Sequence, residues 1–169
     1  MIDGLLQLLS AAIWLILPAY VANAAPVVLG GGKPIDGGRK FTDGRPILGP
    51  GKTIRGLIAG LIAGSIFGAL QGVAVGQIYF YLSYGFLLAL GTLTGDLLGS
   101  FIKRRINLSR GAAAPGLDQL GFVLLALLFA SPLFVPDLEV ILTILIITPP
   151  IHLSTNFIGH KLKLKDRPY

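Results

Sequence analysis

The stretch GLIAGLIAGSIFGALQGVAVGQIYFYLSYGFLLALGTLTG, residues 56–95, contains no charged side chain. A helix that crosses a bilayer needs about 20 apolar residues, so this stretch is long enough for two spans. A polar break at Gln71-Gly72 and Gly76-Gln77 separates its two halves. The sequence therefore predicts a pair of membrane helices at about 54–74 and 78–101.

Three more stretches lack charge, at 4–32, 119–136 and 140–160, and predict helices at about 4–24, 119–135 and 139–159. Only 13% of the 169 residues are charged, against about 25% in an ordinary soluble domain. This composition excludes a soluble globular domain, and the lack of cysteine excludes disulfides and thiolate metal sites. We expect one all-α integral membrane domain over residues 1–169, with five transmembrane helices.

The lysines and arginines indicate the orientation of this domain. All 14 of them fall in or beside two long loops, 30–53 and 102–118, or in the C-terminal tail. The positive-inside rule then places both loops and the C-terminus in the cytoplasm and the N-terminus outside. The net charge of +6 arises from these cytoplasmic segments. We therefore attribute it to membrane orientation and expect no nucleic-acid partner. We expect a multi-pass protein of the cell membrane whose active site lies on the cytoplasmic side.

Glycine recurs at every fourth position from Gly56 to Gly76, and Gly91, Gly95 and Gly99 repeat the spacing on the next helix. Small residues at this spacing let helix backbones approach closely in a membrane. The pattern is typical of helix packing within one chain, and it also allows a homodimer through the glycine-spaced helices.

Asp96 is the first candidate site residue, because a carboxylate inside a membrane is costly and commonly functional. Ser100, Lys103 and Arg104 follow it at helical spacing and are expected on the same face. An ion pair that only neutralises charge is the alternative for Asp96. Asp118 begins the fourth helix, where a carboxylate is also an ordinary N-cap. Two carboxylates with nearby cations at a membrane surface make a plausible Mg²⁺–polyphosphate site.

The loop KPIDGGRKFTDGRPILGPGKTIRG, residues 33–56, combines six cations with many glycines. Its glycines would let backbone N–H groups approach phosphate oxygens, and contact with anionic lipid headgroups is the alternative. The segment GPGKT is not a P-loop, because position 46 is proline and no strand precedes it. His152, Asn156 and His160 form a polar stripe on the last helix, suited to an interhelical seam or to contact with a headgroup or nucleotide.

Several of these motifs resemble a known family. Ser100-Phe-Ile-Lys103-Arg104 and Pro115-Gly116-Leu-Asp118 are similar to the signature of the membrane CTP-dependent cytidylyltransferases, which include CDP-diacylglycerol synthase. The five-span length, the loop Pro34-Ile-Asp36…Asp43-Gly44-Arg45…Gly51-Lys52-Thr53 and the closing His152…Asn156…Lys165…Pro168 look more like the archaeal branch, the CDP-archaeol synthases.

The resemblance implies an activity, a cofactor and site residues. The family transfers CMP from CTP to the phosphate of an ether-linked, geranylgeranylated glycerol phosphate, releases pyrophosphate, and uses Mg²⁺. Asp96, Asp118 and Lys103 would be catalytic, and the two carboxylates would hold the metal. The implied substrate contacts are Ser100, Arg104, Arg105, Asp43, Arg45, Lys52, Thr53, Gln119 and Asn156, of which the loop residues would form a cytoplasmic lid.

One position departs from the family pattern. A second aspartate usually follows the first after three residues, but here that position is Gly121. If that carboxylate is a metal ligand, this chain binds Mg²⁺ weakly or is impaired. The alternative functions are a CDP-diacylglycerol synthase that acts on phosphatidic acid and, in a different class, a small transporter or scaffold subunit.

Overall fold

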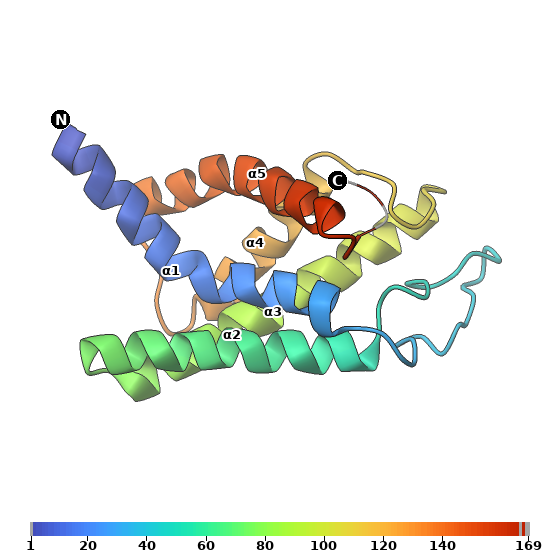
Figure 1. Cartoon of the computed structure of the whole chain (residues 1–169), viewed down its shortest axis with the longest axis horizontal. Helices are drawn as coiled ribbons and strands as arrows, with labels where there is room; N and C mark the ends of the chain where they lie inside the picture. The colour runs from blue at the N-terminus through green and yellow to red at the C-terminus, as the bar shows by residue number, and fades with distance from the viewer. Residues whose placement is uncertain (1, 166, 168–169) are drawn as a thin grey trace.

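The computed structural model describes residues 2–165 and 167. Five helices follow one another along the chain: α1 (Ile2–Leu29), α2 (Ile54–Val75), α3 (Ile78–Arg105), α4 (Leu117–Ala130) and α5 (Leu138–Lys161). The predicted all-helical architecture is confirmed. In Figure 1 the two long loops lie at one end of the molecule, and the N-terminus and the α2–α3 turn lie at the other. The cationic segments are therefore gathered at one end.

Four of the helices, α1, α2, α3 and α5, are long and apolar enough to cross a membrane. Helix α4 has 14 residues and is about 21 Å long, which is shorter than a hydrocarbon core of about 30 Å. The prediction that it extends to residue 135 is wrong. Pro132 and Pro136 fall in the segment after Ala130, and a helix does not continue readily through proline.

The expected polar break between the second and third helices is shorter than predicted. Helix α2 continues through Gln71 and ends at Val75, and its C-cap Gly76 takes the left-handed conformation with φ of 71°. The Gln71 side chain is only 4% exposed, and its Nε2 donates to the backbone oxygen of Trp14 at 2.5 Å. Gln71 therefore joins α2 to α1 instead of interrupting the helix.

The glycine row of α2 packs against α1 and α3 within the chain. A Cβ at Gly64 would lie 2.6 Å from the Ala89 Cβ, and one at Gly68 would lie 2.4 Å from the Tyr81 oxygen. On α3, a Cβ at Gly91 would lie 2.3 Å from the Leu125 oxygen of α4. These contacts confirm that the row packs within one chain, and the homodimer stays a prediction.

Candidate functional site

A polar cavity of about 570 Å³ opens at the end of the molecule that carries the long loops. Its walls come from the end of α1, the loop before α2, the last turns of α3, the loop after α3 and the C-terminal tail. Among the described residues, one carboxylate, Asp96, and five cations line it: Lys52, Lys103, Arg104, Arg110 and Lys165. Such an excess of positive charge favours a ligand that carries several negative charges.

Helix α3 supplies one continuous stripe of this cavity. Asp96, Ser100, Lys103 and Arg104 all line it, as their helical spacing predicted. Ser100 is 6% exposed, so its hydroxyl lies in the wall and not on the open surface. The sequence thus places a carboxylate, a hydroxyl and two cations along one wall.

Asp96 forms an ion pair with Lys52, whose side chain comes from the loop before α2. The sequence offered Lys103 or Arg104 of the same helix as the partner, and the structure instead uses a residue 44 positions away. Both side chains are partly accessible, at 25% for Lys52 and 34% for Asp96. The pair is therefore open to exchange with an incoming ion or ligand.

Asp36 holds the loop in a shape that brings Lys52 to the cavity. Its Oδ2 accepts the backbone N–H groups of Leu48 and Gly49 at 2.8 and 2.9 Å, and its Oδ1 accepts that of Gly38 at 3.0 Å. Although burial acts to raise the pKa of Asp36, these hydrogen bonds hold it below its ordinary value. Thr53 then caps α2, because its Oγ1 accepts the Gly56 N–H at 3.1 Å.

Asp118 pairs with Lys103 at the entrance to α4. Lys103 Nζ lies 2.7 Å from Asp118 Oδ1, with side chains 15% and 20% exposed, and the Ala114 N–H donates to Asp118 Oδ2 at 2.8 Å. The expectation that Asp118 is the N-cap is wrong, because Gly116 occupies that position. The Asp118 carboxylate instead connects α4 to α3 and to the preceding loop.

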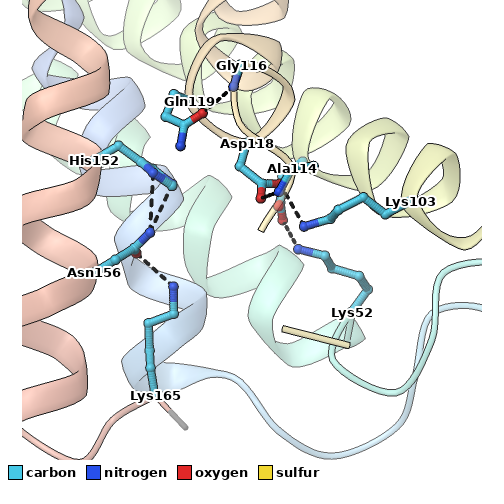
Figure 2. A network of polar contacts seen from close by, with 10 residues as sticks. Lys52, Lys103, Ala114, Gly116, Asp118, Gln119, His152, Asn156 and Lys165 are labelled. Carbon is cyan, nitrogen blue, oxygen red and sulfur yellow. Dashed lines mark hydrogen bonds and ion pairs between the residues drawn. The ribbon is translucent and has the colours of Figure 1, made fainter. Parts of the chain in front are cut away.

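A small hollow of about 60 Å³ lies between α3, α4 and α5, and both Asp96 and Asp118 line it. Each of these carboxylates is paired with one lysine, Asp96 with Lys52 and Asp118 with Lys103. Figure 2 shows the Asp118–Lys103 pair, with Lys52 beside it. Among the described residues, no group of three or more His, Cys, Asp or Glu side chains is arranged to hold a metal ion. Two carboxylates are nevertheless sufficient for Mg²⁺ when phosphate oxygens and water supply the other ligands.

Five predicted substrate contacts lie outside the lining of the polar cavity, and three of them, Asp43, Arg45 and Arg105, contact one another. Arg105 donates to the Asp43 carboxylate at 2.9 Å, and its guanidinium lies 4.8 and 4.9 Å from the ring centres of Phe41 and Phe101. Arg45 donates to the Arg105 backbone oxygen. These contacts fasten the tip of the loop to the end of α3. The sequence could not distinguish this fastening from direct contact with a substrate.

Gln119 and Asn156, two further predicted contacts, have different surroundings. Gln119 Oε1 accepts the Gly116 N–H at 2.6 Å and so closes the start of α4. Asn156 Oδ1 accepts a hydrogen bond from Lys165 Nζ at 2.7 Å, and its Nδ2 lies 3.2 Å from the His152 Nδ1. Sequence reasoning missed Lys165 as a site residue, although it was part of the closing motif. Pro168 of that motif lies outside the described residues.

The chain is similar to known proteins over nearly its whole length. A family model described as CarS-like, CDP-archaeol synthase, matches residues 5–169. A CDP-archaeol synthase of Thermococcus gammatolerans is 49% identical, with 98% of this chain and 99% of the relative covered. One from Pyrococcus horikoshii is 52% identical, with 96% and 98% covered.

A solved structure is also similar, and its description reads "Structural insight into an intramembrane enzyme for archaeal membrane lipids biosynthesis". It superposes with a TM-score of 0.80 at 45% identity, over 86% of this chain and 92% of that chain. Both the family model and these relatives cover nearly the whole chain. The chain therefore belongs to the CDP-archaeol synthase family.

Proposed function

We propose that the polar cavity binds CTP with Mg²⁺, and that the enzyme transfers CMP to the phosphate of an ether-linked, geranylgeranylated glycerol phosphate. The observation that carries this proposal is the pairing of Asp96 with Lys52 and of Asp118 with Lys103 around a common hollow. This arrangement provides two hard anionic ligands and two cations in one place. A metal-bound polyphosphate needs both.

The two lysines have a role before and after the nucleotide binds. In the free enzyme each neutralises a carboxylate that would otherwise be costly at the membrane boundary. When the carboxylates take part in holding Mg²⁺, the ammonium groups become available for phosphate oxygens. Bound Mg²⁺ supplies Lewis-acid polarisation of the phosphate oxygens and stabilises the charge of the leaving group.

The reaction requires no covalent intermediate on the protein. An oxygen of the lipid phosphate forms a bond to the α-phosphorus of CTP, and the bond from that phosphorus to the bridging oxygen of the β-phosphate breaks. The electron pair leaves with pyrophosphate. The contribution of this chain is positioning and charge neutralisation, by Lys52, Lys103 and Arg104 along the cavity wall and by the Ser100 hydroxyl.

The orientation in the membrane follows from the same residues. The cationic loops and the cavity lie at one end of the molecule (Figure 1). Loops of fewer than about 60 residues that are rich in lysine and arginine remain in the cytoplasm. We place this end in the cytoplasm, where CTP is available, with the protein as a multi-pass component of the cell membrane. We place α4 across the bilayer together with the turn and loop at 131–137 that follow it.

The substrate assay uses purified protein in detergent and measures pyrophosphate release. We expect release that requires CTP, Mg²⁺ and the unsaturated ether-lipid phosphate, with little release when phosphatidic acid replaces that lipid. Equal rates with both lipids would contradict the ether-lipid preference and favour a CDP-diacylglycerol synthase. Release that is unchanged when Mg²⁺ is removed with a chelator would contradict the metal site.

A further inference from the structure

A second hollow of about 210 Å³ lies between α1 and α5, next to the polar cavity. Its lining is mostly apolar and includes Val28, Phe122 and Ile158. Four residues line both hollows: Asn23 and Val27 of α1, and Leu164 and Lys165 of the tail. The polar and apolar spaces therefore meet at these four side chains.

Lys165 is the only ionisable side chain among these four shared residues. Its Nζ donates to Asn156 Oδ1 at 2.7 Å, and Asn156 itself is only 9% exposed. Figure 2 shows Lys165, Asn156 and His152 in succession on one side of the site, with Lys52 and Lys103 on the other. The ammonium group is therefore fixed at the boundary by a buried amide.

The ammonium group of Lys165 has a different kind of partner from those of Lys52 and Lys103. The ion pairs of Lys52 and Lys103 satisfy those cations with carboxylates, whereas among the described residues the ammonium of Lys165 is held by an uncharged amide. Burial lowers the pKa of Lys165 below its ordinary value, and repulsion from Lys52 lowers it further. Asp118 and Asp96 act in the opposite direction, but among the described residues neither carboxylate contacts this ammonium group. Burial of such a cation is costly, and a bound anion lowers that cost.

A lipid phosphate carries its negative charge where the polar headgroup meets the hydrocarbon chains. The boundary between the two hollows offers a matching site, with a cation beside an apolar lining. We propose that Lys165, positioned by Asn156, binds the phosphate of the lipid substrate and holds it facing the nucleotide in the polar cavity. The apolar hollow then receives the part of the hydrocarbon next to the glycerol. This inference rests on the proposed function and adds the residue that recognises the second substrate.

The test compares Lys165→Met with Lys165→Arg, using Lys163→Met as a matched control on the exposed tail. Because a charge-assisted hydrogen bond is lost, we expect the KM for the ether-lipid phosphate to rise about ten- to one-hundredfold in Lys165→Met. The KM for CTP and the Mg²⁺ dependence should stay within about twofold of the wild type. A change of that size is well below the effect of losing one charged hydrogen bond. Lys165→Arg should recover most of the lipid affinity, and Lys163→Met should behave as the wild type.

A lipid that lacks the phosphate separates recognition of the phosphate from a general effect on folding. The corresponding ether-linked glycerol should inhibit the wild type and Lys165→Met about equally, because it lacks the charged phosphate that the ammonium group is proposed to bind. An unchanged lipid KM in Lys165→Met, or equal rises in the KM for CTP and for the lipid, would overturn the inference. Absence of pyrophosphate release from the wild-type enzyme would instead refute the proposed function.

Discussion

The substitution Asp96→Asn tests the role of the carboxylate at the centre of the cavity. Asparagine keeps the shape of the side chain and one oxygen but removes its charge. The ion pair that is lost, Asp96–Lys52, involves side chains 34% and 25% exposed, and pairs as accessible as this contribute about 1 kcal/mol or less. For a chain of this size that corresponds to a shift in Tm of about 2–4 °C, so the variant should fold.

The expected effect on catalysis is much larger than the effect on stability. Removing one preorganised group that stabilises the transition state typically lowers kcat by about 10²–10³-fold. If Asp96 also holds Mg²⁺, the concentration of Mg²⁺ needed for half-maximal rate should rise. We therefore expect a folded protein whose rate of pyrophosphate release is at least about a hundredfold below wild type.

The assay is the initial rate of pyrophosphate release at several Mg²⁺ concentrations, with thermal unfolding measured in the same detergent. Asp137→Asn is the matched control, because this substitution makes the same chemical change on an exposed side chain outside the cavity. Near-normal activity of Asp96→Asn with unchanged Mg²⁺ dependence would refute the reasoning and remove Asp96 from the mechanism.

Three further predictions concern packing, pH and the metal. Gly64→Leu should lower Tm by several degrees, since overpacking costs about 1–3 kcal/mol and a Cβ there would lie 2.6 Å from Ala89. Gly4→Leu should leave Tm unchanged, because a Cβ at Gly4 would have nothing within 4 Å. Equal Tm values for the two variants would contradict the packing. Because the pKa of Asp36 is lower in the folded state, its stabilisation is present above its unfolded value of about 3.9 and is lost as pH falls through the folded-state pKa. Thermal unfolding of Asp36→Asn should therefore depend less on pH in this acidic range, and parallel curves would show that the hydrogen bonds of Asp36 do not stabilise the loop. Gly121→Asp should increase activity at low Mg²⁺, because position 121 lies one turn beyond Asp118 on α4. The side chain fits there, since its Cβ would meet only Leu117 at 3.7 Å. An unchanged rate would mean that a carboxylate at this position is dispensable.

The helices were predictable because the uncharged stretches and the glycine spacing are local properties of the sequence. The end of α4 was missed because hydropathy remains high through Pro132, whereas proline interrupts the helix for a steric reason. Gln71 was expected in a polar break because its residue type is polar. Its burial depends on a carbonyl group of α1, and no local pattern reveals that contact.

The α3 wall of the site was predictable for the same reason, since Asp96, Ser100 and Lys103 recur at helical spacing. Their partners were not, because the contact of Lys52 with Asp96 depends on how the loop folds around Asp36. The C-terminal tail was harder to interpret from sequence than the α3 wall. The closing motif includes Lys165, but its contact with Asn156 depends on the packing of the tail against α5, which the sequence does not reveal.

The loop cations show a further limit of sequence reasoning. Arg105 continues the basic run at the end of α3, and the family resemblance implied that it contacts a substrate. In the structure its guanidinium is occupied by Asp43 and by two aromatic rings. Whether a cation is available to a ligand depends on these tertiary partners, which the sequence does not display.

The central claim is that the α-phosphate of CTP is transferred to the lipid, and the position of a radiolabel tests it most directly. The enzyme is incubated with Mg²⁺ and the ether-lipid phosphate, and with CTP labelled at either the α- or the γ-phosphate. The account predicts that the α-label appears in the lipid product and the γ-label in pyrophosphate. Transfer of the γ-label to the lipid would reveal a phosphotransferase and contradict the account.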